Sequence, residues 1–164
     1  MKRLHSPWRS EYIQTFKTPG KKSGCVLCAA LRSDRDDSHY VVARGRHSFV
    51  ILNLYPYNSG HCMVVPNRHV PRLDSLTPAE YSEMFRFIRK VIAGLERVSA
   101  PDGFNIGSNF GRTAGAGIDD HIHFHVVPRW NGDTNFMPVL ADTKVISEEM
   151  NLTWEKLRKA LKRR

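Results

Sequence analysis

The chain has 164 residues, enough for one domain with a hydrophobic core of its own. Its 41% hydrophobic and 25% charged residues are a globular composition that excludes wholesale disorder, and no apolar run reaches the roughly 18 residues of a membrane span. The net charge of +9 suggests a polyanionic partner, but residues 1–22 carry +5 and residues 156–164 carry +6, which leaves the body at −2. The excess charge therefore belongs to the two ends of the chain.

The first 65 residues are predicted to form an N-terminal arm followed by three consecutive strands. Residues 1–24 are expected to form an irregular N-terminal arm. The β-rich segments 40–43 and 47–54 predict a hairpin, because only a short Arg-Gly-Arg stretch separates them. A turn cluster at 56–60 then leads into a third strand over 61–65.

The clearest predicted helix begins at the capping box Thr77-Pro-Ala-Glu80. Apolar residues then recur at helical spacing up to the end signals at 99–103. A fourth strand is predicted over 104–109 and a fifth over 121–128, and a second helix over 147 to about 161. Together these elements predict an α+β domain, an antiparallel five-stranded sheet with a long central helix and a C-terminal helix.

Three cysteines, Cys25, Cys28 and Cys62, are a poor basis for a disulfide framework and favour a reducing, cytoplasmic location. The Cys25-Val-Leu-Cys28 pair is typical either of half a zinc site or of a thiol redox pair. A thioredoxin-type motif would follow a strand, and no strand-like run precedes this pair, so zinc is favoured if two more ligands exist elsewhere. Cys62 lies in an apolar run and is predicted to be a small core residue.

Three histidines alternate with apolar residues in His121-Ile-His123-Phe-His125. In a strand the three imidazoles share one face, while the apolar residues point to the core. Three interpretations are open: a histidine-rich polar face, a three-histidine metal site, and phosphoryl or nucleotidyl transfer. The third is favoured, because alternate side chains about 7 Å apart converge poorly on one ion, whereas a neutral imidazole attacks phosphorus well. The middle histidine is best placed for attack, and the glycine-rich loop 111–117 can present N–H groups to an oxyanion.

The segment from His121 to Val127 resembles the signature of the histidine triad (HIT) superfamily, and the likeness covers nearly the whole chain. Asn53 followed by Gly60-His61 is similar to the family's nucleoside-pocket segment, and residues 109–115 are similar to its phosphate-side loop. Segments 6–13 and 128–136 resemble a narrower branch of ATP adenylyltransferases and diadenosine tetraphosphate phosphorylases.

The resemblance implies a HIT-like domain whose sheet joins that of a second copy in a homodimer. It implies that His123 attacks the α-phosphorus of an adenine nucleotide and forms a nucleotidyl-histidine intermediate, with His121 and His125 as the flanking catalytic histidines. It assigns Asn53 to the ribose, and Phe49 and Ile51 to the base. The phosphate contacts that it implies are Asn109, Gly115, Gly117 and His125. Mg²⁺ could accompany the nucleotide.

The remaining zinc ligands also follow from the resemblance. HIT proteins with an N-terminal C-x-x-C pair are similar to this chain, and they use a histidine after the third strand together with the first triad histidine. Those positions match His69 and His121, so the resemblance implies a closed structural zinc site of Cys25, Cys28, His69 and His121. The spacing fits no zinc-finger pattern, and the alternative is that His69 is an ordinary surface histidine.

One departure from the family pattern bears on function. Many members place a glutamine directly after the Ala-Gly of the loop, where this chain has Ala116 and one extra residue, a pattern that resembles the phosphorylase-like branch. We therefore expect phosphorolysis of a dinucleoside polyphosphate such as diadenosine tetraphosphate. The alternative is hydrolysis of such a compound or of a nucleoside phosphoramidate, and a second is a nucleotide-sensing or nucleic-acid-associated binding module. Asp119 and Asp120 either bring negative charge to the triad or face solvent.

Three regions are expected along the chain. They are an N-terminal arm over 1–24, a HIT domain over 25–145, and a C-terminal helix with a basic tail over 146–164. No membrane association is expected, and nucleic-acid binding by the basic ends is a weaker expectation than nucleotide binding.

Overall fold

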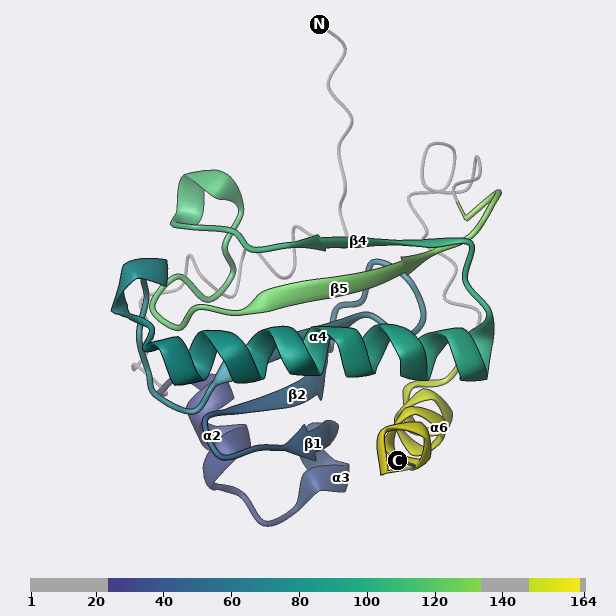
Figure 1. The fold of residues 1–164 in the computed structure, drawn as a ribbon, viewed down its shortest axis with the longest axis horizontal. Coiled ribbons are helices and arrows are strands. Elements are labelled where there is room, and N and C mark those ends of the chain that lie inside the picture. Colours follow the sequence, from purple (N-terminus) through teal and green to yellow (C-terminus); the bar gives the residue numbers. More distant parts are fainter. Residues whose placement is uncertain (1–23, 134–147, 163–164) are drawn as a thin grey trace, which may run out of the picture.

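The computed structural model describes residues 24–133 and 148–162 (Figure 1). Residues 1–23 of the predicted arm, with segment 6–13, therefore lie outside the described residues, as do residues 134–136 of segment 128–136 and the last two residues of the basic tail. The elements in chain order are α2 (Val26–Arg32), α3 (Asp36–His39), β1 (Val41–Arg44), β2 (Ser48–Leu52), β3 (Cys62–Pro66), η1 (Leu73–Ser75), α4 (Pro78–Ser99), β4 (Gly103–Gly107), η2 (Arg112–Ala114), β5 (Phe124–Arg129) and α6 (Met150–Lys162).

The five strands form one antiparallel sheet in the order β1-β2-β3-β5-β4. β2 and β3 pair in continuous register over 48–52 and 62–66. β5 lies between β3 and β4, so His125 is opposite Met63 on one side and Gly107 on the other. This order confirms the predicted α+β fold and places the strand of the histidine triad inside the sheet, with β1 and β4 at its edges.

Helix α4 crosses one face of the sheet, and α6 packs beside it (Figure 1). The apolar stripe of α4 buries Met84, Ile88, Val91 and Leu95, at the i, i+4 and i+7 spacing of an amphipathic helix. Burying each such side chain stabilises the fold by about 1.5–3 kcal/mol. These residues pack against alternate residues of the strands and against Ile122, which precedes β5; the strand residues are Val42, Val50, Leu52, Cys62, Val64 and Val126. Cys62 is 0% exposed, which confirms its prediction as a core residue.

The opposite face of the sheet carries α2. Leu27 and Ala30 of this helix pack on a second apolar cluster that includes Phe49, Ile51 and Met63. Because His125 is the direct partner of Met63, it projects from the same face as this cluster. The sheet therefore separates the main core under α4 from a face shared by α2 and the histidines.

The start of α4 is fixed by the predicted capping box. Thr77 Oγ1 accepts from the Glu80 N–H, and the Glu80 carboxylate accepts from the Thr77 N–H. Arg68 contacts this buried carboxylate at 2.6 Å. The Arg68 and Thr77 hydrogen bonds outweigh burial and lower the pKa of Glu80 to about 2. The same ion pair fixes the backbone next to His69.

Several features differ from the sequence expectation. The short helices α2 and α3 were not predicted, because segments of seven and four residues contain too few turns to show a helical period. The fifth strand begins at Phe124 rather than at His121, because the Ile122 N–H donates to the Val70 carbonyl at 2.8 Å instead of joining the sheet ladder. The predicted strand over 47–54 is shorter at both ends.

The C-terminal helix is confirmed as α6, and its Leu157 is buried in the main core. The proposed division at residues 24/25 and 145/146 stays a prediction. Within the described part of the chain, no helix combines the length and the apolar character needed to cross a membrane.

Candidate active site and metal centre

His123 and His125 lie side by side at the start of β5. Their ring centroids are 4.9 Å apart and their planes make an angle of 84°. Ile122 is buried on the α4 side and Phe124 packs there too, which confirms the predicted alternation of histidine and apolar faces. Ser108 donates to the backbone carbonyl of His123 at 2.7 Å, and this contact was not predicted. This contact ties the backbone at His123 to the segment that follows β4.

Hydrogen bonds assign the proton on each ring. Nδ1 of His123 is 2.9 Å from the His121 carbonyl, which can only accept, so Nδ1 is protonated and Nε2 keeps a free lone pair. The Tyr57 N–H donates to Nδ1 of His61 at 3.1 Å, so Nε2 of His61 bears the proton and donates to Nδ1 of His125 at 3.0 Å. His125 then carries its proton on Nε2. The pair offers one nucleophilic nitrogen and one N–H donor.

His61 was not among the predicted site residues. It directly precedes β3, is 1% exposed, and has its ring centroid 4.8 Å from that of Tyr57 and 5.0 Å from that of His125. Gly60 before it has a φ of +82°, a conformation that favours glycine and turns the chain sharply into the strand. The Gly60-His61 pair was the only sequence signal, and it did not show that this imidazole reaches the triad.

Burial keeps the histidines neutral. Desolvation, reinforced by His125 and His123, lowers the pKa of His61 to about 3. Desolvation and the neighbouring His123 lower the pKa of His125 to about 4. Burial also lowers the pKa of His123, although the hydrogen bond to the His121 carbonyl acts in the opposite direction. A neutral imidazole with an available lone pair is the form that a nucleophile requires at pH 7.

The glycine-rich loop after β4 closes on itself next to the histidines. Asn109 donates to the Gly115 carbonyl at 3.3 Å, and Gly115 has a φ of +89°. Arg112 pairs with Asp119 across the loop at 2.9 Å, so this aspartate has a structural partner. The structure thus brings together Asn109 and Gly115 of the predicted phosphate contacts, while Gly117 is half-buried two residues further along.

A cavity of about 390 Å³ lies beside His125. It is lined by polar side chains from the β2–β3 loop, β4 and the segments that follow it, among them Tyr57, Asn58, Asn105, Asn109 and Arg129. The Arg129 guanidinium is oriented by Asn105 at 2.7 Å and by Asp133 at 2.5 Å. A cavity of this volume admits a small ligand, and its donors suit an anionic one.

The other predicted nucleotide contacts lie on the same side of the sheet. Asn53 follows β2; its Oδ1 accepts from the Tyr55 N–H at 3.0 Å and its Nδ2 is 3.4 Å from Nδ1 of His61. Phe49 is 0% exposed and Ile51 is 6% exposed. A base can contact these two side chains only if the residues that cover them move.

Cys25, Cys28, His69 and His121 converge beside the triad. One ligand atom from each residue lies within 4.8 Å of the others. Nδ1 of His121 is 3.3 Å from the sulfur of Cys25, and Nδ1 of His69 is 3.3 Å from the sulfur of Cys28. A tetrahedral zinc with usual bond lengths separates its sulfur and nitrogen ligands by about 3.5 Å. The four side chains could therefore hold a metal ion of this kind.

The surroundings of these four residues suit metal ligands. Nε2 of His121 is 2.9 Å from the Pro66 carbonyl and Nε2 of His69 is 3.6 Å from a carboxylate oxygen of Asp120, which are the outer contacts that orient ligating imidazoles. Burial, with Cys25 alongside, raises the pKa of the Cys28 thiol, so a thiolate here needs a cation beside it. Both ring nitrogens of His121 are occupied in this arrangement, which favours its role as a ligand over a catalytic one.

Comparisons with known proteins agree with this geometry. The family model described as HIT domain matches residues 35–132. AP-4-A phosphorylase of Mycobacterium tuberculosis is 41% identical over 152 residues, covering 90% of this chain and 78% of the relative. An asymmetrical bis(5'-nucleosyl)-tetraphosphatase of Schizosaccharomyces pombe is 40% identical over 93 residues, covering 57% of this chain and 50% of the relative.

Solved structures show the same fold. A zinc-bound histidine triad family protein from Mycobacterium smegmatis superposes with a TM-score of 0.68 at 27% identity, covering 86% of this chain and 95% of that one. The family model spans more than half of the chain and includes His61 and all three triad histidines. On this evidence, the chain belongs to the HIT family.

Proposed function

We propose that this protein is a nucleotidyl transferase that cleaves a dinucleoside polyphosphate, with diadenosine tetraphosphate as substrate and inorganic phosphate as acceptor. The observation that carries the proposal is the pair of tautomers in the triad: a free lone pair on Nε2 of His123 next to an N–H on Nε2 of His125. The name of the Mycobacterium tuberculosis relative, AP-4-A phosphorylase, supports the substrate and the acceptor.

The reaction has two displacement steps. Nε2 of His123 attacks the α-phosphorus, the bond to the bridging oxygen breaks, and ATP leaves while AMP stays bound to the imidazole. The N–H of His125 stabilises the charge that develops on the phosphate oxygens. A phosphate oxygen then displaces the imidazole and releases ADP, which restores the free histidine. We assign Asn53 to the ribose, Phe49 and Ile51 to the base, and the remaining phosphate contacts to Asn109, Gly115 and Gly117.

The test is product analysis with diadenosine tetraphosphate, with and without isotopically labelled phosphate. We expect ATP and ADP, with the label in the β-phosphate of ADP, and no turnover by the His123→Ala variant although it still binds nucleotide. His39→Ala serves as the matched control, because this half-buried histidine ends α3, which packs at the β1 edge of the sheet. AMP released at the same rate without phosphate would overturn phosphorolysis in favour of hydrolysis, the reaction named for the Schizosaccharomyces pombe relative.

The ion that we propose for the Cys25, Cys28, His69 and His121 cluster is a structural zinc. Two thiolates and two imidazoles satisfy its tetrahedral preference and leave no position open for substrate. When bound, zinc would fix the start of α2 and His121, which lies two residues before His123. The zinc-bound Mycobacterium smegmatis structure supports this assignment. Zinc analysis of purified protein, with Cys28→Ser as the comparison, tests it. Mg²⁺ with the nucleotide and a cytoplasmic location stay predictions.

We also propose a homodimer formed through β4. None of the described segments pairs with the outer edge of this strand, and an open edge invites pairing with another chain. Ile106 on this strand is 48% exposed, and Phe85 on α4 is 54% exposed with its ring 6.0 Å from that of Phe124. Light scattering should give twice the chain mass for the parent protein and a smaller mass for Ile106→Lys. A monomeric parent protein would overturn the proposal.

A further inference from the structure

A second cavity lies at the β1 edge of the sheet, and the proposed catalysis does not use it. Its volume is about 590 Å³, and it is bordered by β1 and the loop after it, by α4 and by α6. We call it the basic groove, because five cations line it: Arg44, Arg86, Lys90, Arg158 and Lys162. The groove also contains two carboxylates, Asp36 and Glu83, so its formal charge is positive by three.

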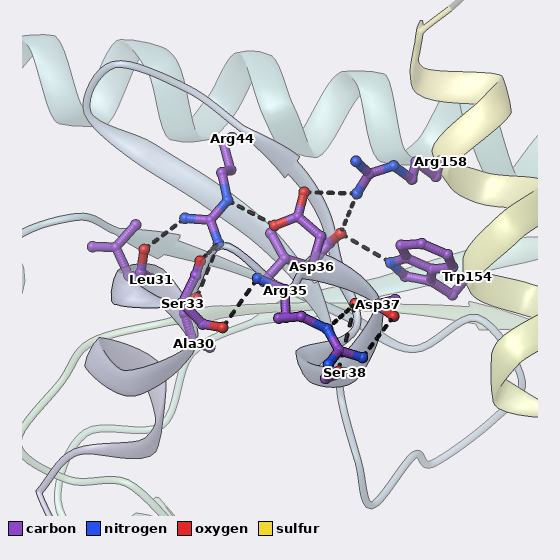
Figure 2. Close-up of polar contacts among 11 residues, drawn as sticks. Ala30, Leu31, Ser33, Arg35, Asp36, Asp37, Ser38, Arg44, Trp154 and Arg158 are labelled. Carbon is purple, nitrogen blue, oxygen red and sulfur yellow. Dashed lines mark hydrogen bonds and ion pairs between the residues drawn. The ribbon is translucent and has the colours of Figure 1, made fainter.

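Both carboxylates of the basic groove are already engaged. Asp36 binds Arg44 and Arg158, each at 2.8 Å (Figure 2). Burial opposes its ionisation, but these two guanidinium groups lower the pKa of Asp36. Glu83 accepts from the Ser48 hydroxyl at 2.9 Å and from two backbone N–H groups, which likewise lower its pKa against the effect of burial. Among the described residues, neither carboxylate pairs with Arg86, Lys90 or Lys162.

Two of the five cations have structural duties. Arg44 donates to the carbonyls of Ala30, Leu31 and Ser33 in addition to Asp36 (Figure 2). Arg158 donates to the Val41 carbonyl at 3.1 Å. These bonds tie α2, α3 and α6 to β1 and make the wall of the groove rigid. The wall is therefore a built feature of the fold, formed whether or not a ligand is present.

The other three cations have no such duties. Within the described residues, Arg86, Lys90 and Lys162 make no hydrogen bond or ion pair. Arg86 and Lys90 are four residues apart on α4, and Arg158 and Lys162 are four residues apart on α6. Like charges at this spacing destabilise a helix, and here two such pairs face one concavity. A cleft lined by one sign of charge concentrates counter-ions of the opposite sign.

We propose that the basic groove is a second anion-binding site, which takes a short chain of linked phosphates, free or attached to a nucleoside. An excess of three positive charges matches a polyphosphate better than a single carboxylate. Phe87 and Leu161 border the groove and offer an apolar surface to a nucleoside. The volume is that of a small-molecule site, whereas a nucleic-acid strand needs cations spread along an extended track. This site would give a binding role to Arg158 and Lys162, two of the cations of the C-terminal helix.

The test is a titration of isotopically labelled protein with tripolyphosphate at constant ionic strength, followed by backbone amide chemical shifts. We expect shifts at Gly45, over 86–90 and over 158–162. Lys90→Ala combined with Lys162→Ala should weaken this binding at least about tenfold, since each lysine supplies a charge-assisted hydrogen bond. The matched control is Arg89→Ala combined with Lys159→Ala, which removes the same charge from exposed positions of the same helices outside the groove and should change the affinity less than about twofold.

Each outcome decides the proposal. Groove shifts with ATP as well as with tripolyphosphate support it and extend it to a nucleoside. Shifts confined to residues around His125 overturn it, because the anion then binds only the catalytic cavity. Equal weakening in the two double variants overturns it in favour of general charge attraction. A single-stranded oligonucleotide that binds the groove when tripolyphosphate does not would replace it by nucleic-acid binding. None of these results depends on turnover.

Discussion

The hydrogen bond between His61 and His125 gives the sharpest prediction, because it sets the tautomer of a catalytic imidazole from outside the triad. Replacing His61 with leucine keeps a side chain of similar volume but removes the acceptor for the Tyr57 N–H and the donor to Nδ1 of His125. With that donor gone, the His125 proton is free to move to Nδ1. Nε2 then presents a lone pair to the phosphate and repels it.

The structure sets the expected magnitude. The variant loses two part-buried hydrogen bonds of about 1 kcal/mol each and leaves the Tyr57 N–H and Nδ1 of His125 without these partners, for a total of about 2–4 kcal/mol of stability. Loss of one donor to the developing charge should lower kcat by about 10- to 100-fold, equivalent to 1.4–2.7 kcal/mol. His61 is 1% exposed, so solvent cannot supply the missing donor without local opening.

The assay compares His61→Leu with His61→Gln at a temperature where both variants are folded. The glutamine amide can donate from a position close to that of the imidazole Nε2, so it should recover most of the lost kcat even if stability stays lower. A His61→Leu variant that is folded and retains kcat within about twofold of the parent protein would falsify the tautomer assignment. Equal losses in the two variants would show that packing, rather than the donated hydrogen bond, is responsible.

Three further predictions concern the metal cluster, pH and the C-terminal helix. Extracting zinc with a chelator should lower the melting temperature by more than about 20 °C, since a structural zinc contributes roughly 10 kcal/mol to the free energy of folding. An unchanged calorimetric transition in the metal-free protein would contradict the proposed ligands. The free energy of unfolding should fall as the pH drops from 6.5 towards 4, because burial lowers the pKa values of His61 and His125 in the folded chain. The slope is about 1.4 kcal/mol per pH unit for each proton that the unfolded chain binds and the folded chain does not. Denaturant titrations should show a smaller pH slope in His61→Gln, and identical slopes would be evidence against the pair. Leu157→Ala should lower the free energy of unfolding by about 2–5 kcal/mol, because Leu157 is fully buried. Leu152→Ala, at an exposed position of the same helix, should lower it by less than about 1 kcal/mol. Similar losses in the two variants would mean that α6 does not dock as described.

Local patterns were sufficient to predict most of the fold. The strands, the long helix with its Thr77–Glu80 capping box and the alternation from His121 to His125 could all be read from residues within a few positions of one another. Such features follow from backbone geometry, which repeats every 2 residues in a strand and every 3.6 in a helix. Helices α2 and α3 were missed because they are too short to display that period.

The sites depended on contacts between distant segments. From the sequence alone, Cys25 and Cys28 were a candidate ligand pair, and His69 and His121 were added only through family resemblance. The docking of α2 beside the triad brings the four together. The link from His61 to His125 spans 64 residues, and it exists because β3 pairs directly with β5. The net charge of +9 comes from the two ends of the chain, and its cations are far apart in the sequence. Only the packing of α4 and α6 against β1 brings five of the chain's cations together in the basic groove. Sequence spacing does not show this, because contacts between side chains of different elements depend on the tertiary fold.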